Sequence, residues 1–138
     1  MQATKEVLKF IDERMKVNEA KKLVEEDLFP NYLIIDYRLK VLKDLKEQTE
    51  DVFEKELEEE NRPIYMQISD LEVIERSIKR TISLIDIQRL EDIGLFMLNK
   101  RYYYMIRENE IEELNLVIGF IESLINALER EEEEHEQD

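Results

Sequence analysis

Few residues in this chain have side chains that commonly do chemistry. It holds 138 residues with one His, no Cys and 35 acidic residues. The absence of Cys excludes disulfides, thiolate zinc sites, thiol nucleophiles and iron–sulfur clusters. The single His135 follows the last apolar residue, Leu128, within an acidic stretch, so we expect an exposed, inert imidazole. Carboxylates are therefore the main groups left to consider.

The spacing of the carboxylates does not match two known helical metal sites. A di-iron bundle needs Glu-x-x-His on two helices, which one His does not supply. A helical nucleotide pyrophosphohydrolase holds magnesium with Glu-Glu-x-x-Glu followed by Glu-x-x-Asp; Glu72 and Glu75 fit in part, but Gln88 to Glu91 does not complete the set. The glycines, Gly94 and Gly119, are isolated and form no phosphate loop. We expect no catalytic residue, cofactor or metal, and hence no enzyme.

The net charge of −15 is concentrated in two short clusters. Residues 50–60 and 129–138 each hold seven acids and one base, whereas residues 1–49 and 61–128 together carry only −3. This distribution of charge argues against a large nucleic-acid interface and allows at most a weak contact with nucleic acid. Like charges without apolar side chains do not pack, so we expect a bundle domain over 1–128 and a disordered acidic tail or linker over 129–138.

The fold class follows from turn residues and apolar spacing. Two Gly and two Pro are too few for the turns of a sandwich or barrel, and apolar side chains recur every three or four residues. These features predict an all-α fold, a bundle of four to six helices with two long helices and the acidic C-terminal tail. No apolar run approaches the roughly 20 residues of a membrane helix and no signal peptide is present, so we expect a cytoplasmic protein without membrane contact.

Local signals suggest where the helices begin and end. Asn18 predicts a break in the first helix, because Asn favours caps over helix interiors. A long helix is expected over about 28–59. Ser69, with Glu three residues later, forms a capping box that predicts the start of another helix. The stretch 100–107, with three successive Tyr, is expected to be a connection or short helix before a last helix over 110–128.

The central helix holds more Ile than one domain usually exposes, so we expect it to meet another subunit. Tyr and Arg commonly anchor protein interfaces. The residues expected at such an interface are Ile82, Ile85, Lys100, Arg101, Tyr103 and Tyr104. A basic group, Arg76, Lys79 and Arg80, shares one helix face and favours a solvated face or salt bridges between subunits; a contact to an acidic partner or DNA is the alternative.

The order of these features resembles the helical domain of GINS-complex subunits from archaeal and eukaryotic replication. In that family a short helix precedes an acidic residue and an aromatic pair that start a long helix, and Asp27 to Leu33 is similar. Ile78, Ile82 and Ile85 leading to Arg89–Ile93 and Phe96–Leu98 resemble the family's later long helix, and Glu110 to Leu114 resembles its acidic last-helix start. The resemblance covers about residues 5–128.

The resemblance implies a non-enzymatic archaeal scaffold subunit. It would form a homo- or hetero-oligomer of related helical subunits and dock the MCM helicase and a RecJ-like protein at the replication fork. The acidic stretch from Glu129 would then be a linker to a small β-rich domain.

Three other interpretations remain open from the residues alone. The first is an acidic helical regulator, or DNA-mimic inhibitor, that binds a nucleic-acid enzyme; it requires acids arranged along a folded surface. The second is a small enzyme using helix carboxylates and a divalent metal ion. The third is an unrelated oligomeric helical protein.

Overall fold

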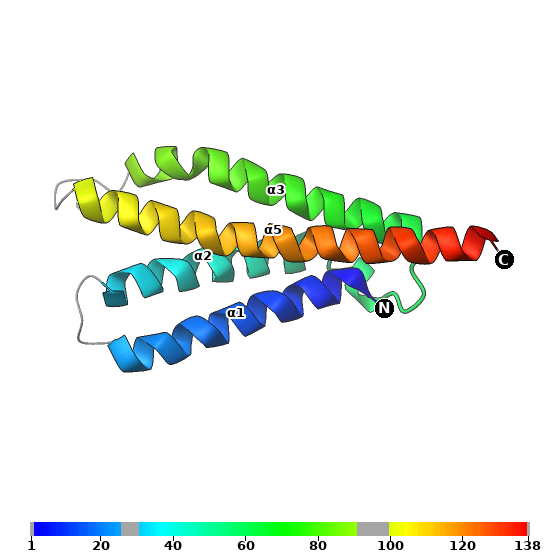
Figure 1. Cartoon of the computed structure of the whole chain (residues 1–138), viewed down its shortest axis with the longest axis horizontal. Helices are drawn as coiled ribbons and strands as arrows, with labels where there is room; N and C mark the ends of the chain where they lie inside the picture. The colour runs from blue at the N-terminus through cyan, green and yellow to red at the C-terminus, as the bar shows by residue number, and fades with distance from the viewer. Residues whose placement is uncertain (1, 26–30, 91–99, 138) are drawn as a thin grey trace.

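The computed structural model describes residues 2–25, 31–90 and 100–137, and within them the chain is helical without strands. The elements are α1 (Ala3–Glu25), α2 (Asn31–Val52), the short 3-10 helix η1 (Glu56–Glu58), α3 (Ile64–Leu90) and α5 (Lys100–Gln137). They form an elongated bundle of antiparallel hairpins, α1 with α2 and α3 with α5 (Figure 1). Of the described α-helices, α1 and α5 each contact the other three. They are therefore the diagonal pair of the bundle whose helices lie closer together. The all-α bundle expected from the sequence is confirmed.

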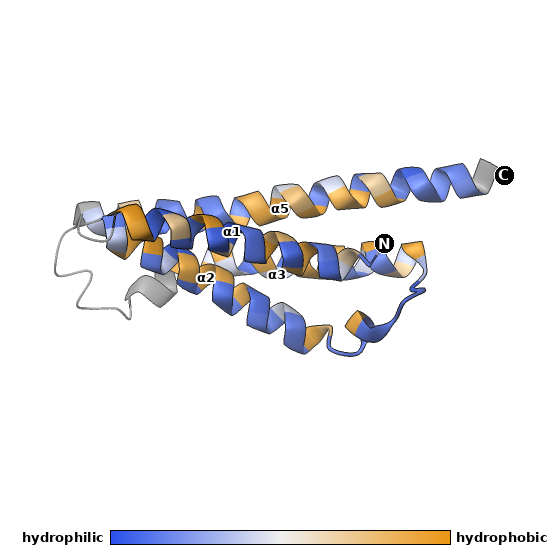
Figure 2. Cartoon of the chain, turned by 90° about the horizontal axis from the view of Figure 1, so that it is seen from below, coloured by the Kyte–Doolittle hydropathy of each residue, from blue (hydrophilic) through white to orange (hydrophobic). Residues whose placement is uncertain are grey.

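The helices hold together through an apolar core that follows their heptad-like spacing. Val7 and Ile11 of α1, Leu42 of α2 and Ile78 of α3 are fully buried in one continuous cluster with the apolar face of α5. Figure 2 shows these hydrophobic faces turned toward one another, with polar residues outward. A second, smaller cluster around Ile34 and Ile106 lies nearer the connections between the paired helices.

The expected break at Asn18 is wrong: α1 is continuous over its 23 residues. Asn18 is fully buried, and its amide donates hydrogen bonds to the Arg14 carbonyl and to the Glu113 carboxylate. A partner on another helix therefore offsets the weak helix preference of Asn. The long helix expected over 28–59 is shorter than predicted, since α2 ends at Val52.

The expected cap at Ser69 is also wrong, because α3 already begins at Ile64. The Pro63 carbonyl accepts hydrogen bonds from the amides of Met66 and Gln67. Proline fits the start of a helix because its missing N–H needs no partner there. The nearby Asp70 is held by Arg62, and Gln67 accepts a hydrogen bond from the Ala3 amide at 2.9 Å. These contacts join the starts of α1 and α3.

The last helix is longer at both ends than the sequence predicts. Residues 100–107 form the first turns of α5 instead of a connection, and α5 stays helical through the acidic stretch to Gln137. Here the structure differs from the expected disordered tail or linker. Glu is a good helix former, and the packed segment up to Leu128, which is 1% exposed, supplies the nucleus from which the helix continues.

Two parts of the family resemblance lie partly outside the described residues, namely the stretch Asp27 to Leu33 and the stretch from Arg89 to Leu98. The four α-helices within the described residues each hold at least 22 residues. The structure therefore contains more long helices than the two that the sequence predicts. None of the described helices is both long and apolar enough to span a membrane.

A matched pair of substitutions tests the core. Leu42 is fully buried, whereas Leu23 is 81% exposed. We expect Leu42→Ala to lower the free energy of unfolding by about 2–5 kcal/mol, because it leaves a cavity. Leu23→Ala should change it by less than about 0.5 kcal/mol. Urea unfolding followed by circular dichroism measures both, and equal effects would contradict this packing.

Candidate functional site

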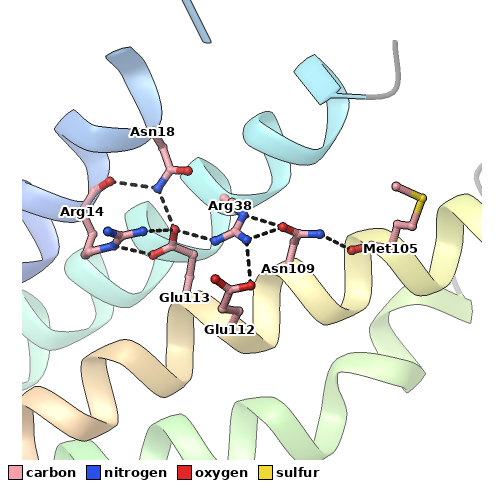
Figure 3. A network of polar contacts seen from close by, with 7 residues as sticks. All are labelled: Arg14, Asn18, Arg38, Met105, Asn109, Glu112 and Glu113. Carbon is pink, nitrogen blue, oxygen red and sulfur yellow. Dashed lines mark hydrogen bonds and ion pairs between the residues drawn. The ribbon is translucent and has the colours of Figure 1, made fainter. Parts of the chain in front are cut away.

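An extended arrangement of polar side chains surrounds Glu113 of α5. Its carboxylate is fully buried and accepts two hydrogen bonds from Arg14 of α1, at 3.0 and 2.8 Å, and one from the Asn18 amide at 2.8 Å (Figure 3). The two-point contact with Arg14 fixes both distance and orientation. Glu113 therefore joins the middle of α1 to α5.

Arg38 brings α2 into the same arrangement. Its guanidinium donates to the Glu113 carboxylate at 2.8 Å and to Glu112 at 3.1 Å. It also donates to the side-chain oxygen of Asn109, whose own amide donates to the Met105 carbonyl at 2.7 Å (Figure 3). We call Arg14, Asn18, Arg38, Asn109, Glu112 and Glu113 the polar clamp, because together they link three helices.

The electrostatics of the clamp favour an ionised Glu113. Burial alone would raise the pKa of its carboxyl, but hydrogen bonds from Arg14, Asn18 and Arg38 outweigh burial and lower that pKa. The hydrogen bond to Glu113 in turn raises the pKa of Arg14. Two arginines and two glutamates leave the clamp without net charge, which limits the cost of burying it.

The clamp lies at the border between the two apolar clusters of the bundle. Ile106, one turn before Glu110, belongs to the smaller cluster, and Leu114 directly after Glu113 belongs to the main core. A polar layer in a helical core fixes which residues pair across helices. Because the charged groups of the clamp already contact one another, we interpret the clamp as a device that positions α1, α2 and α5 relative to each other.

One signal in the sequence could have revealed the clamp. Glu110 and Glu113 occupy core positions in the apolar repeat of α5, between Ile106 and Val117, and both are almost completely buried. A carboxylate in core register requires a cation from another helix. The sequence does not say which of the 20 basic residues supplies it.

The two acidic clusters, distant in the sequence, lie at the same end of the bundle. Residues 50–60 close α2 and form η1, and residues 129–137 are the end of α5, which projects beyond the other helices (Figures 1 and 2). We call this end, residues 50–60 and 129–137, the acidic pole. Most of its carboxylates are exposed, so their charges face solvent or a partner.

The acidic pole contains a hollow of about 530 Å³ between the start of α1 and the end of α2. Its lining residues are Lys5, Leu8, Glu50, Asp51, Glu54 and Leu57. Two leucines, three carboxylates and the single ammonium of Lys5 surround one space, so the lining keeps a net negative charge and suits a side chain with an apolar stem and a cationic head, such as Lys or Arg.

The loop beside this hollow is fixed by Arg62. Its guanidinium donates to both Asp70 carboxylate oxygens, at 2.6 and 3.1 Å, and to Glu59 at 2.8 Å. The hydrogen bonds to Asp70 and then Glu59 raise the pKa of Arg62. Gln2 adds a hydrogen bond from its amide to the Glu56 carbonyl. The acidic pole is therefore tied to the starts of both α1 and α3.

The expected interface residues fall into three groups. Ile85 and Tyr103 are buried within the chain, and Ile82 packs against its core, because that face of α3 contacts α5. Tyr104 is 54% exposed, with its ring edge-on to Tyr103, so an interface role there stays a prediction. Lys100 and Arg101 lie in the first turn of α5, and their side chains are outside the described part of the structure.

The basic group on α3 is solvent-facing, as expected. Arg76, Lys79 and Arg80 are all exposed, and Lys79 lies 3.3 Å from Glu75 of its own helix. Within residues 2–25, 31–90 and 100–137, no three His, Cys or acidic residues are placed to hold a metal ion. The chain matches no protein-family model, no curated protein and no solved structure.

The pH dependence of stability tests the clamp. We expect Glu113→Gln to lower the free energy of unfolding by about 3 kcal/mol at neutral pH, because the partly buried Arg14 and Arg38 lose the carboxylate that they share. Folding lowers the pKa of Glu113, so its contribution is present above the unfolded pKa of about 4.3 and is lost as the pH falls through the folded value.

The difference between the wild-type chain and Glu113→Gln should therefore shrink steadily in acid. Urea unfolding between about pH 7 and pH 3 measures it. The exposed Glu122, changed to Gln, serves as the control and should show a small difference throughout. A Glu113→Gln difference that stays constant with pH would contradict the ionised clamp.

Proposed function

We propose that this chain is a non-enzymatic docking subunit that binds a basic surface of a partner protein through its acidic pole. The observation that carries the proposal is the hollow lined by the carboxylates of Glu50, Asp51 and Glu54, by Leu8 and Leu57, and by Lys5. Three carboxylates against one ammonium leave this lining net negative, so together with the two leucines it is complementary to a Lys or Arg side chain.

The position of the acidic pole supports the same function. Docking requires groups that are exposed but held in place, and residues 50–60 of the pole meet both conditions through the contacts of Arg62 and Gln2. The negative charge of two clusters at one end also speeds the approach of a cationic partner. In a GINS-like assembly, which the sequence resembles, this partner would be the MCM helicase or the RecJ-like protein, and the chain would act as a replication-fork scaffold.

Neutralising the rim of the hollow tests this function. We expect Asp51→Asn with Glu54→Gln to raise the Kd for the MCM helicase or RecJ-like protein of the same organism by about tenfold, because two interface charges are lost. Asp44→Asn with Glu47→Gln makes the same change at exposed positions earlier on α2, outside the hollow, and should alter Kd by less than about twofold.

Isothermal titration calorimetry at several salt concentrations measures both double variants. The affinity of the wild-type chain should fall with salt. Absence of binding to either partner protein would contradict the scaffold proposal, and equal losses in the two double variants would contradict the hollow as the docking site.

A second candidate function is supported by the helical end of α5. A DNA mimic needs carboxylates on an ordered surface, and residues 129–137 continue α5 as helix at the same end of the bundle as the carboxylates of residues 50–60. On this interpretation the chain would occupy the DNA site of a nucleic-acid enzyme. Duplex DNA separates the two functions: it should displace a mimic from the partner protein, whereas a scaffold should remain bound together with the DNA.

A further inference from the structure

One cation lies among the carboxylates of the hollow at the acidic pole. Lys5 lines the same space as Glu50, Asp51 and Glu54. Leu8 also lines it, and because Leu8 follows Lys5 by three residues on α1, the two side chains share one face of that helix. The start of α1 lies at the same end of the bundle as the end of α2 (Figure 1). The hollow therefore receives its positive charge from α1 and its negative charges from the end of α2 and the residues that follow it.

The ammonium of Lys5 is not paired with one particular carboxylate. The residue is exposed, and within residues 2–25, 31–90 and 100–137 it forms no ion pair of 4.0 Å or less. Lys46, which also lies beside Glu50, is instead paired with Asp12 at 2.8 Å. The charge of Lys5 therefore acts on the three carboxylates of the hollow through space.

The position of Lys5 is unfavourable for α1 itself. Lys5 lies in the first turn of this helix, which begins at Ala3. The partial positive charge at a helix N-terminus interacts unfavourably with a cation. The carboxylates of the hollow offset this repulsion in the free chain. A cationic side chain that entered the hollow would share these carboxylates with Lys5 and would be repelled by its ammonium.

We propose that Lys5 sets the docking affinity of the acidic pole, because it competes with the partner's cationic side chain for the carboxylates of the hollow. This inference rests on the proposed function, since it concerns the same hollow. Three negative charges and one positive charge give the lining a net charge of −2 with Lys5 present. Loss of the Lys5 charge leaves all three carboxylates to the partner and strengthens docking.

Removing the charge of Lys5 tests this role. We expect Lys5→Gln to lower the Kd for the MCM helicase or RecJ-like protein about threefold, the effect of two like charges about 6 Å apart in water. Lys5→Arg keeps the charge and should not show this gain. Lys16→Gln makes the same change at an exposed position of α1. It lies about 16 Å further along the helix, where salt screens its charge, and should change the Kd by less than about 1.5-fold.

A small probe separates the role of Lys5 from the identity of the partner protein. N-acetyl-arginine amide carries one guanidinium on an aliphatic stem, and the amide chemical shifts of Asp51 and Glu54 in the full chain report its binding. Lys5→Gln should again lower the Kd about threefold, whereas Lys16→Gln should not. Binding of the probe without binding of either partner protein would contradict the proposed function and leave the role of Lys5 standing.

Three results would overturn the role of Lys5. The first is a Kd that Lys5→Gln leaves unchanged or raises, for the probe or for a partner protein that binds; the docking function would then stand without it. The second is an equal gain in Lys16→Gln, which would reflect net charge and not the hollow. The third is a probe that does not shift the amides of Asp51 and Glu54, because the hollow would then not bind a cation.

Discussion

The buried carboxylate of Glu113 is the constraint on which the arrangement of the other helices depends. Apolar packing would tolerate small shifts of one helix along another, because Leu, Ile and Val contacts are not directional. The two-point contact with Arg14 and the contacts from Asn18 and Arg38 allow one placement of α1 and α2 on α5. A shift that broke these contacts would leave an uncompensated buried charge, which is far more costly than a lost apolar contact.

This fixed placement determines what the surface presents. With α1 and α2 held on α5, the end of α2 lies beside the start of α1, and the hollow forms between them.

The carboxylates at the end of α5 destabilise that end of the helix, because negative charge at a helix C-terminus interacts unfavourably with the helix dipole. A cationic partner would relieve this cost, so the same feature that weakens the isolated helix end strengthens its attraction for a basic surface.

The sequence predicts the part of this structure that depends on local periodicity. The apolar repeats of Val7 and Ile11, and of Ile78 and Ile85, are sufficient to predict helices and their buried faces. The errors arise where a distant residue overrides a local preference. Asn18 indicates a break only if Glu113 is ignored, and Ser69 resembles a cap only if Pro63 is not considered. The sequence does not predict the clamp, because its two arginines lie 75 and 99 residues from Glu113 in the chain.

The proposed docking role requires that the acidic residues of this chain belong to an ordered surface. The most direct measurement is the set of Cα chemical shifts of residues 129–137 in the full chain, by nuclear magnetic resonance. We expect shifts typical of a helix, continuous with those of the packed part of α5 up to Leu128. Random-coil shifts beginning directly after Leu128 would contradict it, because the acids would then form a tether instead of a docking surface.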